Sequence, residues 1–531
     1  MKSLIIILFI SVLSDKPSFV LSDRDYSSST AEMVRLLRVR QSLASVLYEY
    51  AVKLQKKLET LELVIEQMQT ALTKFETWGI GQDFSAIKSF ALLRHLHHDW
   101  PKWLSFMRQN DGKADIENMA SLREYLPSKD DFSEARHSIY LLVSMYDLKV
   151  HDLSRGRING RQYRSRLDVL DSFALAKFGH QKGYYLQAAD WFEMTEIFYF
   201  VAFSKPLEVM GFYFAQAWQL YARNLLDMNK KVSALKILRE ALTWASYDMV
   251  IERQISQLKR DLYQLGEAKK DQYEEFYPAH KEGCRGLFED PNDLSCHYDF
   301  TSHPFLRLAP FKVEVLNEDP FVAKYYDAIY DSEISELKNI TIPIMTRSST
   351  VDRESYEMKK NPGRTSKGHF HRADSSWVVK SINQRISQIT GFGLRSKKTG
   401  DSLLVLNYGL GGQYLPHYDT LGANSTIFIS EGDRLATVIF YLSDVEQGGL
   451  TVFPHLRISH TPQKGTALLF YNLNPKTLQK DKYSAHSACP VLIGSKWVSA
   501  TWIYSADQMF HLPCALQYDN DDDSFEDLEE Y

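Results

Sequence analysis

One apolar seam constrains this 531-residue chain more than any other feature, and it runs between residues 33 and 76. Its members recur every three or four positions with charged residues between them, which places them on one face of a long α-helix. They are Leu36, Val39, Leu43, Leu47, Tyr50, Leu54, Leu58, Leu61, Ile65, Met68 and Leu72. Gly79 and Gly81 then end the pattern. We predict a helix in a region (23–130) that either dimerises with a second chain or packs against the helices that follow it.

The helical pattern continues through residues 131–250, where two stretches, 174–188 and 222–234, resemble each other. At equivalent positions of the two, a small residue is followed four positions later by a large one: Ala188 by Phe192, and Ala234 by Leu238. Helix pairs with this spacing can stack closely, as tetratricopeptide repeats do, and such repeats more often bind peptides than carry out catalysis. We therefore predict a tetratricopeptide-like, peptide-binding domain at 131–250.

A different pattern begins near residue 311, after a charged linker at 251–310 that holds the first two cysteines. One amphipathic helix is followed by short strand-like segments at 403–408, 435–442, 466–471 and 497–504. Several short strands without long intervening helices favour a jelly roll. The predicted class is multidomain α+β: an all-α N-terminal half, a C-terminal jelly roll (double-stranded β-helix) at 311–515 with its core at 399–505, and an acidic tail at 516–531.

The first residues have the features of a signal peptide. Lys2 precedes an apolar run at residues 4–13, and the small residues Ser14 and Ser22 both offer cleavage sites. The run is shorter than the ~18 residues of a membrane span, so we expect residues 1–22 to be removed and no span to remain. Asn339 and Asn424 begin glycosylation sequons, which are usable only if exposed. A net charge of −5 argues against nucleic acid as a partner.

The four cysteines form two sequence-local pairs, Cys284 with Cys296 and Cys489 with Cys514. In the oxidising compartment that a signal peptide implies, we predict a disulfide within each pair, which is one of three possible connectivities. A zinc site is the alternative. It finds little support, because the sequence has no C-x-x-C motif or neighbouring Cys and His with ligand spacing.

The motif His-x-Asp occurs three times, beginning at His97, His297 and His417. Two histidines and a carboxylate on one face hold Fe(II) in non-haem oxygenases, and on a strand residues two apart point to the same side. The copy at His97 lies in the helical half, where residues two apart do not share a face. The copy at His297 lies beside a cysteine in a loop, although further histidines and Lys380 follow it. The copy at 417–419 follows a predicted strand and a Gly-rich turn, and it is our candidate.

Two later residues strengthen this candidate. His486 supplies a distal histidine, and ten residues later Lys496 begins an alternating strand that places Val498, Ala500 and Trp502 on the same face. A lysine among apolar neighbours requires an anionic partner, and the carboxylate of an iron-chelating keto acid is a natural one. Each residue alone also fits an ordinary structural role. Together they predict a site for a metal and a keto acid.

Residues 399–514 resemble the catalytic domain of collagen prolyl 4-hydroxylase alpha subunits. The matching segments are long and specific: 407–419, 434–437, 441–445, 448–454 and 486–499. A weaker resemblance extends over the whole chain and includes residues 146–160. The Cys489–Cys514 pairing also fits the pattern of this family.

The resemblance implies that His417, Asp419 and His486 bind Fe(II) and that Lys496 pairs with the distal carboxylate of 2-oxoglutarate. Tyr408 and Arg434 match active-site positions of the family. Ascorbate is implied as the cofactor that restores oxidised iron.

The same resemblance implies an assembly and a substrate. The N-terminal region would dimerise, the repeat-like middle would bind proline-rich, collagen-like peptide, and protein disulfide isomerase would be the beta subunit of an α2β2 assembly. Because the sequence has no K-D-E-L-type ending, that partner would retain the chain in the endoplasmic reticulum lumen. We expect a procollagen-proline 4-dioxygenase. The alternatives are a related 2-oxoglutarate hydroxylase with a non-collagen substrate and a non-catalytic peptide-binding scaffold.

Overall fold

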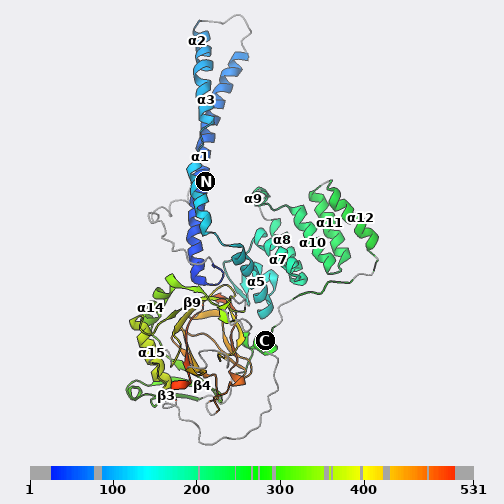
Figure 1. Ribbon diagram of the computed structural model, residues 1–531. Helices are drawn as coiled ribbons and strands as arrows, with labels where there is room; N and C mark the ends of the chain where they lie inside the picture. Colours follow the sequence, from blue (N-terminus) through cyan, green and yellow to red (C-terminus); the bar gives the residue numbers. More distant parts are fainter. Residues whose placement is uncertain are drawn as a thin grey trace. The chain divides into compact units, whose positions relative to one another are not determined.

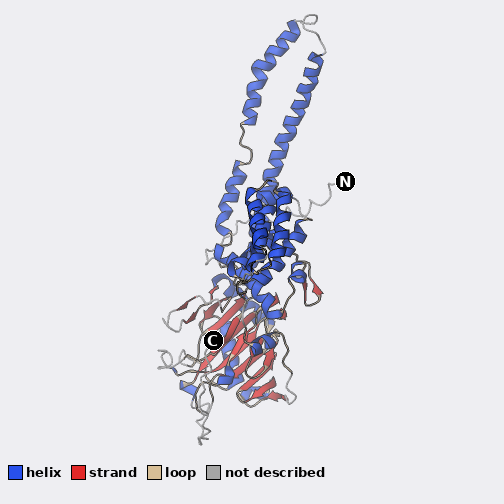
Figure 2. Ribbon diagram, turned by 90° about the vertical axis from the view of Figure 1, so that its right-hand side faces the viewer, coloured by secondary structure: helices blue, strands red, loops and turns tan. Residues whose placement is uncertain are grey.

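A computed structural model describes residues 25–508, apart from gaps at 77–85, 201–203, 246, 263, 265–266, 273–275, 290–294, 352–357, 360–362, 395–398, 422–430 and 475–476. The predicted signal peptide, the acidic tail, Asn424 and Cys514 lie outside these residues. Glu32–Ser128 forms one compact unit, and Met1–Ala31 together with Lys129–Tyr531 forms the other. Helices dominate the first half of the sequence and strands the second, which confirms the predicted multidomain α+β class. Figure 2 shows the helices in blue and the strands in red.

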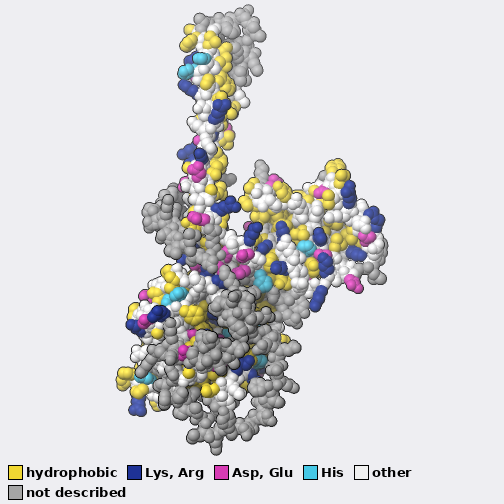
Figure 3. Space-filling view, in the orientation of Figure 1, with side chains coloured by type: hydrophobic (Ala, Val, Ile, Leu, Met, Phe, Trp, Pro, Cys, Tyr) yellow, Lys and Arg dark blue, Asp and Glu magenta, His cyan; other side chains and the backbone are white. Residues whose placement is uncertain are grey.

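The unit Glu32–Ser128 is built on helix α1 (Thr30–Glu76), whose 47 residues confirm the long helix that the apolar seam predicts. The elements that follow are α2 (Ala86–Arg94), the π-helix η1 (His95–Asp99), α3 (Trp100–Met107), α4 (Lys113–Ser121) and the 3-10 helix η2 (Leu122–Tyr125). A salt bridge of 2.6 Å joins Lys53 to Asp115, so α1 also contacts α4. Seam residues such as Leu47 and Leu58 nevertheless remain exposed, and hydrophobic side chains are visible along this unit in Figure 3.

The second unit begins with a helical region in which neighbouring helices lie side by side (Figure 1). Its elements are α5 (Lys129–Tyr146), α6 (Val150–Ser154), β1 (Arg157–Ile158), β2 (Arg161–Gln162), α7 (Val169–Lys182), α8 (Tyr185–Tyr199), α9 (Ser204–Val209), α10 (Phe214–Asp227), α11 (Lys231–Trp244) and α12 (Met249–Asp261). The equivalent positions Ala188 and Ala234 are both fully buried, in α8 and α11. Small residues at these positions let each helix approach its partner closely. Two stacked helix pairs, α7 with α8 and α10 with α11, result.

The strand-rich part of this unit, residues 295–508, contains two large sheets besides smaller two-stranded ones. The larger has nine strands in the order β3-β4-β5-β16-β12-β19-β10-β9-β6, all paired antiparallel, and the smaller has the order β11-β17-β14-β15. The strands of the larger sheet are β3 (Ser295–Asp299), β4 (Phe311–Glu318), β5 (Phe321–Tyr326), β6 (Thr346–Arg347), β9 (Ser366–His371), β10 (Leu403–Tyr408), β12 (Arg434–Tyr441), β16 (Ala467–Tyr471) and β19 (Trp497–Tyr504). Those of the smaller are β11 (Tyr414–His417), β14 (Thr451–Phe453), β15 (Ile458–His460) and β17 (His486–Ala488). The four strands that the sequence predicts become the neighbours β16-β12-β19-β10.

Alternation along these strands separates two cores. Residues such as Val405 and Val438 face outward and pack on helix α15 (Trp377–Thr390), which lies beside α14 (Asp331–Thr341) along the sheet (Figure 1). Residues such as Leu404 and Phe470 face inward and pack on Phe453 of the smaller sheet. Two antiparallel sheets that enclose one core form the predicted jelly roll. None of the described helices has the length and apolar character needed to cross a membrane.

The remaining elements are short. They are α13 (Pro278–Cys284), η3 (Pro304–Arg307), η4 (Ile342–Ile344), β7 (Thr350–Val351), β8 (Met358–Lys359), β13 (Val445–Gly448), η5 (Lys482–Ser484), β18 (Val491–Gly494) and η6 (Ala506–Gln508). Strand β3 lies in the predicted linker, so the large sheet begins before residue 311.

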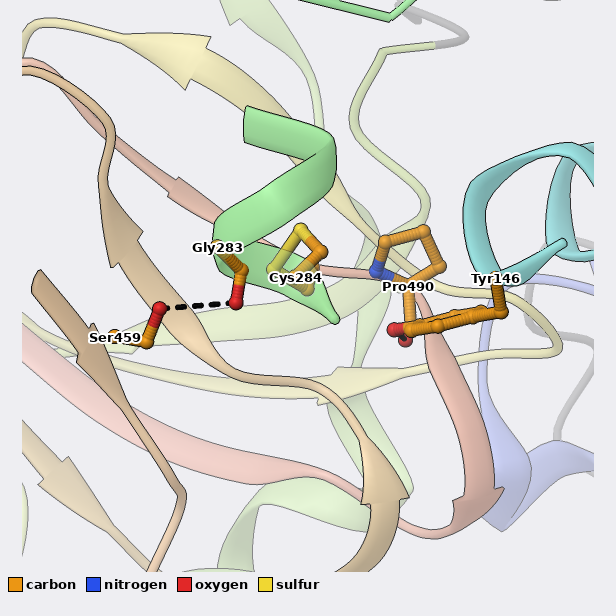
Figure 4. The surroundings of a disulfide bond; sticks show 6 residues. Tyr146, Gly283, Cys284, Ser459 and Pro490 are labelled. Atoms are coloured by element: carbon orange, nitrogen blue, oxygen red, sulfur yellow. Dashed lines mark hydrogen bonds between the residues drawn. A yellow bond between two sulfur atoms is a disulfide. The ribbon is translucent and has the colours of Figure 1, made fainter. Parts of the chain in front are cut away.

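The predicted disulfide pairing is wrong. Helix α13 packs through Cys284 on Val452 of β14, and the Ser459 hydroxyl donates to the carbonyl of Gly283 over 2.9 Å (Figure 4). This places Cys284 beside Cys489, and the two form a disulfide with their Cα atoms 5.4 Å apart. Cys296 is a free, exposed thiol on the edge strand β3, so neither the 284–296 nor the 489–514 bond forms. The pairing depends on the tertiary contact of α13, which sequence spacing does not reveal.

Candidate active site

Strand pairing brings the three predicted metal ligands together. His417 ends β11, His486 begins β17, and the two residues face each other across these neighbouring strands. Asp419 follows two residues after His417. One possible ligand atom from each of the three side chains lies within 4.8 Å of the other two, so the group could hold a metal ion.

Backbone carbonyls fix the orientation of both histidine rings. The Nδ1 atom of His417 lies 2.8 Å from the Leu415 carbonyl oxygen, and that of His486 lies 3.1 Å from the Ser484 carbonyl oxygen. A carbonyl can only accept, so each Nδ1 carries a proton and each Nε2 is turned toward Asp419. These Nε2 atoms lie 3.4 and 3.6 Å from the carboxylate oxygens of Asp419. This is the arrangement that metal-binding histidines require.

Asp419 is buried and held by neighbours that favour its ionised form. Burial raises the pKa of its carboxyl, but His486, His417 and Arg434 together lower it well below the usual value. The Thr437 hydroxyl donates to Asp419 Oδ2 over 2.8 Å. For His486, burial lowers the pKa to about 4, which leaves its ring neutral near pH 7. The cluster therefore offers one carboxylate and a neutral imidazole, the protonation states that bind a cation.

Lys496 lies in the same interior. Its side chain is 1% exposed, and its ammonium nitrogen has no hydrogen-bond partner among the described residues. Burial lowers the pKa of this amine to about 7. Val498 and Trp502, the following inward-facing residues of β19, belong to the inner core. A buried, unpaired cation is costly to a fold, so its presence indicates a site for an anion.

Tyr408 and Arg434 occupy different positions around the site. Tyr408 is buried, its ring centre lies 5.2 Å from the Lys496 Nζ atom, and burial raises its pKa to about 12. Arg434 donates to the backbone carbonyl of Asp419 over 3.2 Å and to the Asp401 carboxylate over 2.8 Å. Its guanidinium also lies 4.1 Å from the ring centre of Trp502. Arg434 therefore supports the metal-ligand loop rather than facing an open space.

Sequence reasoning missed several supporting residues. The Asn472 amide donates to the Thr437 hydroxyl over 2.8 Å and thereby orients it toward Asp419. The ring of Tyr414 stacks on His417 with centres 3.5 Å apart. Asp401 anchors Arg434, as described above. Strand alternation could have found Thr437, because it lies two residues from inward-facing Ile439, but no local signal marks Asn472.

The two rival His-x-Asp motifs do not form sites. His97 and Asp99 lie in the exposed π-helix η1, where Asp99 pairs with Arg94 and His95. His297 is exposed on β3, and the Asp299 carboxylate accepts from Thr301 and Ser302. Of the histidines downstream, His371 bonds Thr341, and Lys380 is exposed on α15. A further group, His280 with Cys284 and Cys489, lies close together, but the disulfide occupies both sulfur atoms.

Comparison with known proteins gives consistent matches. Residues 29–160 match the family described as prolyl 4-hydroxylase alpha-subunit, N-terminal region, and residues 403–504 match the 2OG-Fe(II) oxygenase superfamily. The chain is 30% identical over 520 residues to a prolyl 4-hydroxylase subunit alpha-2 of Gallus gallus, covering 93% of this chain and 96% of that one. A subunit alpha-2 of Caenorhabditis elegans is 28% identical over 536 residues, with 96% and 97% covered. The structure of a viral collagen prolyl hydroxylase from Paramecium bursaria Chlorella virus-1 is 26% identical, covers 35% of this chain and 96% of that one, and has a TM-score of 0.28.

Proposed function

The chain belongs to the family of prolyl 4-hydroxylase alpha subunits, and from this premise we propose that it hydroxylates C4 of peptidyl proline in X-Pro-Gly-type sequences. It is a 2-oxoglutarate- and Fe(II)-dependent dioxygenase, as its oxygenase domain and its relatives indicate. One observation supports the activity above all: a His-Asp-His cluster, with Asp419 and His486 buried, lies in the same domain interior as an unpaired lysine. A peptide-binding scaffold would gain nothing from that lysine, which weakens the fold unless an anion pairs with it.

Each residue of the site then has a role. His417, Asp419 and His486 hold Fe(II), and Lys496 pairs with the distal carboxylate of 2-oxoglutarate. Bound Fe(II), with 2-oxoglutarate and O₂, supplies the oxidising chemistry: one oxygen atom enters C4 of proline and the other enters the succinate that forms as CO₂ leaves.

The chain's own contribution is geometry and exclusion of water. The rings of Phe470 and Phe453 lie 4.6 and 5.7 Å from the ring of His486 and cover it with apolar surface. In such an environment the attraction between Lys496 and a carboxylate is stronger than in water. Thr437 and Arg434 keep Asp419 in place through its side chain and its carbonyl. These contacts support a metal site at the His-Asp-His cluster and a carboxylate site at Lys496.

We assign the proline-rich, collagen-like peptide to the helix pairs. Tyr185 begins α8 with a partly exposed side chain, and the Lys269 ammonium lies 5.9 Å from its ring centre. The backbone carbonyl of Tyr185 accepts from the Asn224 amide over 2.9 Å, which ties the first helix pair to the second. Tyr221 of the second pair is instead buried, with its ring stacked on Phe192 at 4.9 Å. A ligand in the polyproline II conformation suits the surface around Tyr185, because it is already extended and loses little entropy on binding.

The remaining assignments concern the assembly and its compartment. Exposed seam residues on α1 suit dimerisation, since apolar surface in a helix is stabilised by a second helix. We further propose protein disulfide isomerase as the beta subunit of an α2β2 assembly, ascorbate as the reductant and the endoplasmic reticulum lumen as the compartment. Asn339 is exposed on α14, which suits glycosylation.

A reconstitution experiment tests this function. The purified chain, with and without protein disulfide isomerase, is incubated with (Pro-Pro-Gly)n, Fe(II), ascorbate and 2-oxoglutarate, and 4-hydroxyproline is measured by mass spectrometry. We expect turnover that disappears in His417→Ala. Decarboxylation of 2-oxoglutarate stimulated by a different peptide would instead indicate a related hydroxylase. Peptide binding without iron-dependent decarboxylation would exclude both enzyme functions and leave the scaffold.

A further inference from the structure

The first described residues of the chain lie inside the oxygenase-like domain. We call Asp25–Ala31 the N-terminal strap. Ser28 and Ser29 are fully buried, and the Ser27 carbonyl accepts from the backbone N–H of Leu410 over 3.1 Å. The neighbouring Gly409 has no room for a side chain, because a Cβ atom there would lie 2.0 Å from the Ser27 carbonyl oxygen. The strap is thus packed on the Gly-rich turn that precedes the metal-ligand strand β11.

An ion pair fixes the beginning of the strap. Asp25 and Arg347 are both buried, with Asp25 Oδ1 3.2 Å from the Arg347 Nη1 atom. Arg347 also contacts Glu134 of α5 over 2.9 Å, and the Ser27 hydroxyl donates to the same carboxylate over 2.7 Å. Buried charged groups with several partners hold a segment in one geometry. The strap is therefore a specific part of the domain, although more than 260 residues separate it from β3, the first strand of the large sheet.

Asn407 joins the strap to the candidate active site. This residue of β10 is fully buried, and its Oδ1 atom accepts from the Ser29 hydroxyl over 2.7 Å and from the Ala31 backbone N–H over 3.1 Å. Its Nδ2 atom donates to the backbone carbonyl of Lys496 over 3.1 Å. One side of the amide faces a backbone donor and the other a backbone acceptor, so its orientation is determined.

The backbone around Lys496 is held by these groups and by Ser443. The Ser443 hydroxyl donates to the Ser495 carbonyl over 2.7 Å and accepts from the Trp497 N–H over 2.9 Å. The Lys496 carbonyl also accepts from the backbone N–H of Tyr408 over 3.1 Å. The preceding residue, Ser495, has its hydroxyl 2.5 Å from the Thr30 hydroxyl and 3.2 Å from the Asn407 Nδ2 atom. The lysine side chain leaves this clamped backbone and enters the inner core. Displacing the backbone by ~1 Å would displace the ammonium, and misplacement on that scale strongly weakens a charged contact in a binding site.

We propose that the N-terminal strap is a positioning element for Lys496, acting through Asn407, and that it sets the affinity for the distal carboxylate of a 2-oxo dicarboxylic acid. This inference rests on the proposed function, because it takes Lys496 as the anion-binding group. The strap residues are neither metal-ligand candidates nor the anion-binding group. They act on the site through Asn407 and the backbone of Lys496, so the oxygenase site depends on residues from the start of the described chain.

Substitutions at Thr30 and Asn407 in the full chain test this role. Thr30→Val keeps the shape of the side chain and removes its hydroxyl, whereas Thr30→Ser keeps the hydroxyl. Asn407→Asp keeps the shape and loses the donor to the Lys496 carbonyl. Ser42→Ala is the matched control, because the Ser42 hydroxyl bonds only its own helix, at the Arg38 carbonyl, and is exposed.

We expect KM for 2-oxoglutarate to rise about tenfold in Asn407→Asp and about threefold in Thr30→Val, with KM for the peptide within twofold of wild type. Thr30→Ser and Ser42→Ala should resemble wild type. A merely structural role would lower the active fraction and leave both KM values unchanged. An unchanged KM for 2-oxoglutarate in Thr30→Val, or an equal rise in both KM values, would overturn the proposal.

Two measurements do not depend on turnover. Calorimetry with N-oxalylglycine and Mn(II) gives the affinity for a 2-oxo diacid directly, and we expect it to weaken in the same order as the KM values rise. In the metal-free Asn407→Asp and Thr30→Val variants, hydrogen exchange at the Tyr408 amide should be faster than in wild type, because this N–H bonds the Lys496 carbonyl. If wild type binds N-oxalylglycine yet hydroxylates no peptide, the proposed function fails while the role of the strap is still decided by these affinities.

Discussion

Replacing Lys496 by methionine should make the ligand-free protein more stable and the enzyme less active. Burial lowers the pKa of this amine from 10.5 to about 7. Because one pH unit corresponds to about 1.36 kcal/mol, holding the charged form in the folded protein below pH 7 costs roughly 5 kcal/mol. Methionine has a similar length and no charge. We therefore expect Lys496→Met to raise the free energy of unfolding of the ligand-free protein by at least ~2 kcal/mol, after local relaxation.

The assay compares urea unfolding of wild type and Lys496→Met at pH 6.5, without metal or 2-oxoglutarate. Lys380→Met, on the exposed face of α15, is the control and should change little. Because the variant lacks the partner of a buried carboxylate, KM for 2-oxoglutarate should rise on the order of 100-fold or more. A variant that is less stable than wild type would show that Lys496 has a structural partner. An unchanged KM would remove it from the site.

Three further predictions concern pH, the metal and the disulfide. Since only the ammonium form of Lys496 pairs with a carboxylate, KM for 2-oxoglutarate should rise above pH ~7, by up to tenfold per pH unit. The ligand-free protein should become more stable between pH ~7 and ~10.5, because the lysine of the unfolded chain binds its proton more tightly than the buried lysine does. Lys496→Met should abolish both trends. Thr437→Val removes the donor to Asp419 and should weaken Mn(II) binding ~10-fold or more in a titration, while the far-ultraviolet circular dichroism stays the same. Cys284→Ser opens a link across 205 residues and should cost roughly 3–5 kcal/mol, seen as a lower unfolding temperature than wild type without reductant and little difference with it.

Local sequence patterns were sufficient to predict most residues of the candidate active site. The alternation that begins at Lys496 places Val498 and Trp502 in the inner core, as expected for residues two apart on a strand. The pairing of His417 with His486 across β11 and β17 follows from the same strand logic once both are placed in one jelly roll. The long helix was equally accessible, because a sustained apolar period depends only on neighbours along the chain.

Contacts between distant segments were not accessible. The bond between Cys284 and Cys489 depends on where α13 packs, and the shorter spacing to Cys296 was misleading because β3 carries that thiol to the sheet edge. The strap was missed for a related reason. Asp25 and three following serines have the composition of a solvated linker, and their burial depends on Asn407, far along the sequence. Polar segments become buried only when specific partners satisfy them, and periodicity cannot show those partners.

The pairing of His417 with His486 has a mechanical consequence. The two ligands come from separate strands whose register is irregular between Tyr414 and His417. A metal bound there would fasten β11 to β17 at the point where the register between the two strands shifts. Loss of the ion would then loosen the contact between β11 and β17 as well as stop catalysis, because metal binding also stabilises the local fold. Enzyme molecules that have lost their iron would thus be more readily cut by proteases, which would remove inactive copies selectively.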